Sequence, residues 1–275
     1  MSATARTDYT YLREIVFQHS QNVVEPSHDH LFQSRLVGLL QRHGMSRLDE
    51  LVRLMRLAKS AELERSVAEA MTINETSFFR DSRSFDLLRT EVIPTLIEAR
   101  RGTRRLRLWS AASSTGQEAY SVAILMREHF PQLSGWSLRI EGTDICAEVV
   151  QRARQGRYHR IEMNRGLPAR ILVRYFNHVG EDWMIKPEIA ELCNFRQANL
   201  CAPLPFKERF DVILLRNVML YFSQETRRAL LAAMHRLLAP DGYLFLGSAE
   251  QPPDRSLWET VLSGGTCYYR PRQPA

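Results

Sequence analysis

The spacing of hydrophobic positions changes near residue 105 of the 275-residue chain. Before this point, apolar residues recur every three to four positions, as in amphipathic helices, and two such stripes cover residues 31–40 and 48–55, with Gly44 between them as a stop signal. After it, short apolar runs alternate with helical patterns, which is typical of an α/β sheet. We predict an all-helical domain over residues 1–70, a linker over residues 71–90 and an α/β domain over residues 91–275.

The α/β part opens with an apolar run at residues 106–109, a turn of small residues from Ser110 to Gly116, and a helical pattern. Strand, tight turn and helix in this order begin a nucleotide-binding, Rossmann-like sheet. Further strands are predicted at residues 136–143, 193–198, 210–215, 243–247 and 266–270. Helices are predicted at residues 84–101, with a break or kink near Pro94, and at residues 147–155 and 224–238.

The alternation of strands and helices is interrupted between residues 156 and 192. Apolar residues there are separated by Gly166-Leu167-Pro168 and by a turn from Asn177 to Asp182. We predict a short helix and a small antiparallel hairpin, inserted as a β-subdomain over residues 156–192.

The turn at residues 110–116 contains one glycine, and Glu118 falls in the first turn of the helix that follows. A pyrophosphate needs bare glycine backbone and a helix N-terminus without negative charge. A carboxylate at this position repels phosphate and suits an ammonium group. The turn therefore favours a ligand with an adenosine half, an amino-acid half and no phosphate, such as S-adenosylmethionine, over a nicotinamide dinucleotide.

Polar residues also follow the next two predicted strands of the sheet. Asp144 ends the second strand, where a nucleotide-binding sheet places a carboxylate on the ribose hydroxyls; the alternative role for Asp144 is to cap the next helix. Asn199 and Leu200 leave the strand at residues 193–198, where they can give adenine an amide and an apolar contact or can form an ordinary turn.

The apolar run at residues 210–215 is followed by Arg216, Asn217 and Tyr221. Open α/β sheets bind ligands at the carboxyl ends of their strands. We therefore expect these three side chains at the mouth of the site.

Composition limits the class of protein further. With 44% hydrophobic residues and no apolar window of about 18 residues, we expect a soluble chain without a transmembrane helix or signal peptide. The four cysteines form no CxxC pair and His28-Asp29-His30 has no third ligand nearby, so neither disulfides nor a metal site is predicted. The net charge of +6 is carried mostly by arginine and is consistent with a solvated face or with an acidic partner.

Two stretches resemble one known family. TINETSFFRD at residues 72–81, whose adjacent Phe78 and Phe79 indicate packing onto the rest of the chain, and WSAASSTGQEAYS at residues 109–121 are similar to the chemotaxis receptor (CheR-type) methyltransferases. The resemblance implies a cytoplasmic enzyme that uses S-adenosylmethionine to methylate glutamate side chains on the cytoplasmic helical domain of bacterial chemoreceptors. It also implies that the cofactor is surrounded by Asn74, Thr76, Arg80, Ala111, Glu118, Asp144, Ile145, Asn199, Leu200, Arg216 and Asn217.

Arg80 and Tyr221 are our candidates for orienting the substrate carboxylate, since a guanidinium offers a two-pronged grip and a phenol one hydrogen bond. Arg80 is assigned to cofactor, substrate or both. In families of this kind the β-subdomain can grip a receptor tail peptide, but the turn at residues 177–182 looks short, so we expect no dependence on a tail. The enzyme is expected to be a monomer without nucleic-acid binding or membrane insertion. Receptor docking is expected on Arg35, Arg42, Arg47, Arg53, Arg56 and Lys59.

Two other functions remain open at this stage. The chain could be an adaptor that binds S-adenosylmethionine without transferring its methyl group, or a methyltransferase for another acidic protein. A nucleic-acid methylase is disfavoured because Asn217-Val218-Met219-Leu220 lacks the Asn-Pro-Pro-aromatic motif of such enzymes.

Overall fold

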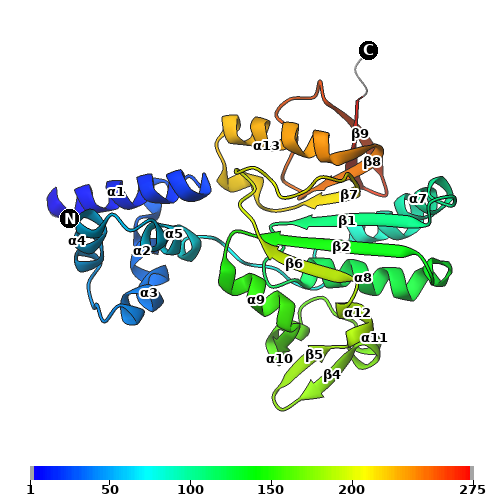
Figure 1. Cartoon of the computed structure of the whole chain (residues 1–275), viewed down its shortest axis with the longest axis horizontal. Coiled ribbons are helices and arrows are strands. Elements are labelled where there is room, and N and C mark those ends of the chain that lie inside the picture. The colour runs from blue at the N-terminus through cyan, green and yellow to red at the C-terminus, as the bar shows by residue number, and fades with distance from the viewer. Residues whose placement is uncertain (1–2, 273–275) are drawn as a thin grey trace. The chain divides into compact units, whose positions relative to one another are not determined.

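The computed structural model describes residues 3–272, with side chains from Thr7 onward. The chain folds into two compact units. One holds the residues up to Ile73 together with Tyr221–Thr226, and the other holds Asn74–Leu220 together with the residues from Arg227 on. The chain can be followed through both units in Figure 1.

The first unit is helical and has its own apolar core. Its amphipathic stripes put Leu12, Phe32, Leu36, Leu51 and Met55 inside, where all five are fully buried. The stripe predicted over residues 31–40 is shared by two short helices, because the chain is interrupted at Leu36. The helices of this unit are α1 Ala3–Ser20, η1 Pro26–His28, α2 His30–Arg35, α3 Val37–Arg42, α4 Leu48–Ala58 and α5 Ala61–Ala70.

The second unit is built around a seven-stranded sheet in the order β6-β2-β1-β7-β8-β10-β9 (Figure 1). Its first five strands are parallel, and β10 runs antiparallel to both of its neighbours. The chain moves from β1 outward to β2 and β6 and then returns to β7 on the other side of β1, which is the doubly wound topology. The strands are β1 Arg105–Ala111, β2 Ser137–Asp144, β6 Cys193–Gln197, β7 Phe210–Leu215, β8 Leu238–Leu246, β9 Trp258–Ser263 and β10 Thr266–Pro271.

Every strand predicted for the main sheet is present, and so are α9 (Ala147–Gln155) and α13 (Gln224–Leu237). The strand predicted at residues 243–247 is longer than expected, because β8 begins at Leu238. Strand β9 was missed. It lies at the edge of the sheet, and after Trp258 its side chains are exposed or half-buried. An edge strand of this kind has no continuous apolar run by which the sequence could reveal it.

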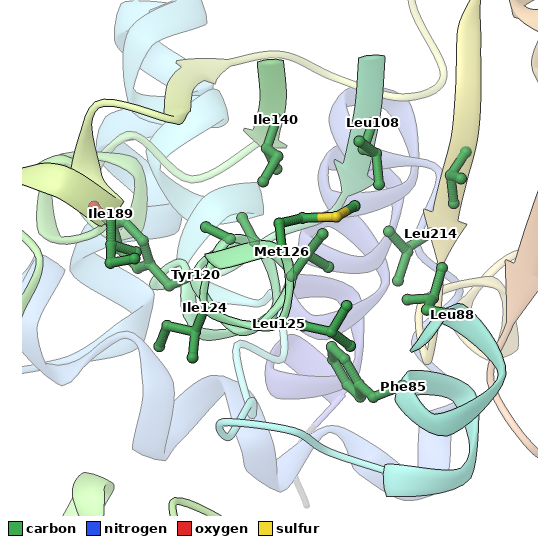
Figure 2. Packing of buried hydrophobic residues seen from close by; sticks show 14 of the residues in the cluster. Phe85, Leu88, Leu108, Tyr120, Ile124, Leu125, Met126, Ile140, Ile189 and Leu214 are labelled. Carbon is green, nitrogen blue, oxygen red and sulfur yellow. The ribbon is translucent and has the colours of Figure 1, made fainter. Parts of the chain in front are cut away.

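Helix α8 (Gln117–His129) lies at the centre of the second unit's core. Figure 2 shows Tyr120, Ile124, Leu125 and Met126 spread around its circumference. They pack against the strands above, and against helical and loop segments on both sides. A helix that is apolar on all sides has to be enclosed, so the turn that precedes α8 is anchored in the core of the unit.

The helix predicted at residues 84–101 is divided into three parts. It begins as α6 (Ser82–Leu87), widens into a π-helix, η2 (Leu88–Val92), and continues as α7 (Ile93–Ala99). Pro94 explains the change, because it cannot donate the backbone hydrogen bond that a regular α-helix would need at that position.

The insertion contains a three-stranded antiparallel sheet in the order β3-β5-β4, with β3 Arg157–His159, β4 Phe176–Val179 and β5 Asp182–Ile185. The predicted hairpin is confirmed as β4 and β5. Strand β3 was missed because three residues are too short for a period-2 pattern. The helices of the insertion are α10 Arg160–Met163, α11 Ala169–Tyr175 and α12 Pro187–Ala190.

Candidate functional site

The β1–α8 turn (residues 112–116) has a backbone that few residue types adopt. Ala112 and Ser114 have φ of 59° and 49°, and Gly116 has φ of 94°. A Cβ on Gly116 would lie within 3.0–3.2 Å of three neighbouring side chains, so only glycine fits there. The N–H of Ser113 donates to the C=O of Thr143 at 2.8 Å, which ties the turn to β2.

Glu118, in the first turn of α8, is paired with Arg216, which follows β7. Nη1 of Arg216 donates to Oε2 of Glu118 at 2.8 Å, and the hydroxyl of Ser110 donates to Oε1 at 2.7 Å. Strands β1 and β7 are adjacent and parallel, so the residues beyond their carboxyl ends meet at one edge of the sheet. The sequence placed both residues at this edge but did not predict their ion pair.

Arg216 also fixes the segment at residues 72–81. Its side chain is only 1% exposed, and Nη2 donates to the C=O of Arg80 at 2.6 Å and to Oδ2 of Asp81 at 3.0 Å. The guanidinium carbon lies 5.6 Å from the centre of the Phe85 ring. The side chain of Arg80 itself donates to the C=O of Glu75 at 2.8 Å. Arg80 is therefore held beside the Arg216–Glu118 pair by its backbone.

The two phenylalanines of this segment pack inward, which confirms the prediction that the segment folds onto the rest of the chain. Phe78 is fully buried and makes edge-to-face contacts with Tyr158 of β3 and Phe176 of β4, with ring centres 5.1 and 5.4 Å away. The N–H of Phe79 donates to the hydroxyl of Ser121 in α8 at 2.9 Å.

Tyr158 connects the β-subdomain to the β1–α8 turn. Burial raises the pKa of its phenol well above 10, so the hydroxyl stays protonated and donates to the C=O of Thr115 at 2.8 Å. Gly166 closes the same region: a Cβ there would lie 2.2 Å from the C=O of Phe78. Residues 74–81, the turn and the β-subdomain thus pack together within the second unit.

Asp144, at the end of β2, organises its surroundings through both carboxylate oxygens. Oδ2 accepts from the N–H of Ser114 at 2.9 Å, and Oδ1 accepts from the N–H of Cys146, before α9, at 3.0 Å. Asp144 therefore has the structural role, at the start of the next helix, that the sequence left open as the alternative. A carboxylate oxygen can accept more than one hydrogen bond, so this structural role is compatible with a contact to hydroxyl groups of a ligand.

Ile145, Asn199 and Leu200 follow the adjacent strands β2 and β6. The side-chain amide of Gln197 donates to the C=O of Ile145 at 2.9 Å, which joins the two strand ends. The side chain of Asn199 accepts from the N–H of Cys201 at 2.9 Å, and Leu200 is buried. The ordinary turn considered for Asn199 is thus observed, at the edge of the sheet where a ligand is expected.

Asn74 and Ala111 also reach this edge. The C=O of Asn74 accepts from the hydroxyl of Ser114 at 2.7 Å, while Ala111 is the buried last residue of β1. Thr76, between Asn74 and Arg80, is half-buried.

Tyr221 was the second candidate for orienting the substrate carboxylate. Its segment belongs to the helical unit, where the C=O of Tyr221 accepts from the N–H of Val23 at 2.9 Å and Phe222 forms a bridge with Asn22. The substrate role given to Tyr221 therefore stays a prediction from sequence.

Sequence reasoning missed Glu250, whose carboxylate accepts from the N–H of Asn217 at 2.8 Å. It also missed Ser113, whose hydroxyl is buried and has no hydrogen-bond partner among residues 7–272. The available signal for Glu250 was its place just after the strand predicted at residues 243–247. The sequence offers no comparable signal for Ser113, because its burial follows from the tertiary fold.

The donor set at this edge fits S-adenosylmethionine. Glu118 suits the ammonium group and Asp144 suits the ribose hydroxyls, and the buried hydroxyl of Ser113 adds a polar group within the turn. The nearby guanidinium of Arg216 is already held by two carboxylates, so it is poorly suited to a phosphate. Within residues 3–272, no helix is long and apolar enough to cross a membrane, and no cluster of His, Cys, Asp and Glu could hold a metal.

The sheet is doubly wound with one antiparallel strand, Glu118 follows β1 and Asp144 ends β2. With a β1–α8 turn that is not a glycine-rich phosphate loop, these features define the class of S-adenosylmethionine-dependent methyltransferases. Comparison with known proteins narrows the class. The family described as CheR methyltransferase, SAM binding domain, matches residues 74–267. The chain belongs to this family and uses S-adenosylmethionine as its methyl donor.

Curated relatives cover nearly the whole chain. Chemotaxis protein methyltransferase 1 of Pseudomonas aeruginosa is 38% identical over 255 residues, which is 91% of this chain and 92% of the relative. Chemotaxis protein methyltransferase Cher2 of Pseudomonas putida is 34% identical over 253 residues, 90% of this chain and 91% of the relative. A TehB-like SAM-dependent methyltransferase structure from Corynebacterium glutamicum covers 70% of this chain and 96% of its own, at 14% identity and a TM-score of 0.38, a likeness too weak to support an argument.

Proposed function

We propose that the chain methylates glutamate side chains on the helical domain of chemoreceptors, producing glutamate methyl esters. The observation that carries this proposal is Arg80, whose backbone is fixed beside the Arg216–Glu118 pair. Among residues 7–272, its guanidinium donates only to the C=O of Glu75. A guanidinium with four further N–H donors can hold a carboxylate in a two-pronged grip. The names of the relatives, chemotaxis protein methyltransferases, support the choice of substrate.

The chemistry requires positioning rather than proton transfer. S-adenosylmethionine, when bound, supplies an electrophilic methyl group. A glutamate with a pKa of about 4.3 is already ionised at neutral pH, so the enzyme needs no general base. The tasks left to this chain are to orient the substrate carboxylate through Arg80, to bind the cofactor through Glu118 and Asp144, and to exclude water. Positioning of this kind can contribute roughly 7–11 kcal/mol.

The direct test is transfer of label from tritiated cofactor to receptor cytoplasmic domains. A glutamate ester is cleaved by alkali, so the label should be released as methanol. A receptor domain truncated before its C-terminal tail should be labelled at the same rate, because only Gly180 and Glu181 lie between β4 and β5. Label that survives alkali would point to N- or S-methylation and would contradict the proposal.

Replacing Arg80 with alanine separates an enzyme from an adaptor that only binds cofactor. We expect Arg80→Ala to lower kcat/KM for the receptor by about 10- to 100-fold, the effect of losing charged hydrogen bonds, while S-adenosylhomocysteine still binds in calorimetry. Arg139→Ala is the matched control, since Arg139 is exposed on β2. If the native chain transfers methyl groups and Arg80→Ala transfers them at the same rate, Arg80 has no role in transfer.

We further propose that the receptor docks on the basic side chains of the helical unit. Arg42 and Lys59 are exposed and have no ion pair among residues 7–272. Arg53 is 71% exposed, and its ion pair with Asp49 is long, at 3.9 Å. Three other candidates are engaged: Arg47 with Asp49 at 2.9 Å, Arg56 with Asp8 at 3.3 Å, and Arg35 with the C=O of Met71 at 2.8 Å. The first three are therefore best suited to an acidic partner.

Reversing two of these charges, Arg53→Glu with Lys59→Glu, should raise KM for the receptor by roughly tenfold at low salt, because electrostatic attraction speeds the encounter. The difference should shrink as salt is added. KM for S-adenosylmethionine should not change, and Arg139→Glu controls for overall charge. A KM for the receptor that is the same in variant and native enzyme across the salt range would exclude this docking surface.

A further inference from the structure

Glu250 lies in the loop after β8 and is buried, with 6% of its surface exposed. Oε2 accepts from the N–H of Gly247 at 2.7 Å and from the N–H of Asn217 at 2.8 Å. Oε1 accepts from the N–H of Met219 at 2.7 Å and from the N–H of Leu220 at 3.3 Å. Four backbone N–H groups thus converge on one side chain, and no cation pairs with it among residues 7–272.

Burying a carboxylate costs free energy unless its oxygens are hydrogen-bonded, so Glu250 can stay buried only while its N–H donors are in place. The four donors come from the two segments that follow β7 and β8, which are adjacent parallel strands. Glu250 therefore binds together two strand ends at the edge of the sheet where the site lies. We call Glu250 and its four donors the β7–β8 clamp.

The clamp holds residues 216–220, the turn that follows β7, which we call the β7 turn. Asn217 has φ of 59°, in the left-handed region, and Met219 begins the short helix η4 (Met219–Tyr221), whose first N–H groups have no partner within the helix. Gly247 packs directly against this turn, because a Cβ there would lie 2.7 Å from Nδ2 of Asn217 and 2.9 Å from its backbone N. A side chain at 247 would displace the turn.

Arg216 immediately precedes the clamped residues. Its side chain bonds to Asp81 and makes two bonds beside the proposed cofactor site, to Glu118 at 2.8 Å and to the C=O of Arg80 at 2.6 Å. A shift of the turn by a fraction of an ångström would lengthen both. We infer that Glu250 is a positioning residue for cofactor binding, which acts by fixing the turn that carries Arg216 and Asn217. The inference rests on the proposed place of these two residues in the cofactor site, and not on which protein is methylated.

Glu250→Gln is the sharpest variant, because it keeps the shape of the side chain but replaces one acceptor oxygen with an NH₂ donor that faces backbone N–H groups. We expect the Kd for S-adenosylhomocysteine, measured by calorimetry, to rise by about tenfold or more. KM for S-adenosylmethionine should rise in parallel, and KM for the protein substrate should stay the same. Amide hydrogen exchange at Asn217, Met219 and Leu220 should become faster, while exchange in β1 and β2 is unchanged.

The control is Glu259→Gln in β9, whose side chain is exposed, and it should match the native chain in every measurement. A purely structural role for Glu250 would lower the amount of folded enzyme, and hence kcat, without changing either KM. If Glu250→Gln loosens the turn but leaves the Kd for S-adenosylhomocysteine unchanged, the inference is overturned. Should Glu250→Gln fail to fold, Gly247→Ala decides: its Cβ would crowd both Asn217 and the Oε2 of Glu250, and an unchanged Kd for S-adenosylhomocysteine there overturns the inference as well.

Discussion

Replacing Arg216 with methionine should lower the free energy of unfolding by about 3–5 kcal/mol and abolish measurable cofactor binding. The side chain is 1% exposed and pairs with both Glu118 and Asp81. Methionine fills similar space but leaves the Glu118 carboxylate, 14% exposed, without its cation, and removing one partner of a buried pair costs that amount. Urea denaturation measures the first effect, and calorimetry with S-adenosylhomocysteine measures the second.

A double-mutant cycle separates the pair from the packing around it. Adding Glu118→Gln to Arg216→Met removes the unpaired charge, so part of the lost stability should return. Arg216→Lys should not restore binding, because one ammonium cannot reach Glu118, Asp81 and the C=O of Arg80 together. An Arg216→Met protein as stable as the native chain and equal to it in cofactor affinity would show that the pair is unimportant.

The second large effect is expected at Asp144. Asp144→Asn keeps one acceptor oxygen and turns the other into a donor that faces the N–H of Ser114 or Cys146. We expect the Kd for S-adenosylhomocysteine to rise by about 100-fold, since both the β1–α8 turn and the proposed ribose contact are affected. Glu148→Gln, at an exposed position of α9, should leave the Kd unchanged.

A cofactor analogue without ribose hydroxyls distinguishes the two contributions. The native chain should bind this analogue more weakly than S-adenosylhomocysteine, whereas Asp144→Asn should bind both with similar affinity. If the variant discriminates between them as strongly as the native chain does, Asp144 supports the turn but does not contact the ribose.

The sequence predicted the fold well because the central parallel strands, β1 and β7, are buried over most of their length. The run Phe210–Leu215 is buried at every position, and such continuous apolar stretches are recognisable without tertiary information. The missed strands, β3 and β9, are short or exposed and depend on a neighbouring strand for their conformation. The π-helix at Leu88–Val92 follows from Pro94, but the sequence does not specify how the chain accommodates that proline.

The candidate site was predictable only in part. Glu118 and Asp144 stand at fixed distances from a strand and a turn, so the rule for strand carboxyl ends located them. The bonds of Arg216 to Glu118 and Asp81, and of Glu250 to the β7 turn, join residues 98, 135 and 33 positions apart. No local spacing encodes such contacts, because they exist only after β7 and β8 have been added beside β1.

The bond from Tyr158 to Thr115 makes the inserted sheet a support for the turn beside it. Its inner positions, among them Tyr158 and Phe176 against Phe78, are therefore constrained by the catalytic unit. We expect substitutions in this sheet to be tolerated mainly at its outer positions, such as His178 and Met184, which are exposed. A chimaera that exchanges residues 156–192 with a relative has to carry a phenol at 158 and a glycine at 166. Without them we expect the β1–α8 turn to lose its support and the chimaera to be less stable.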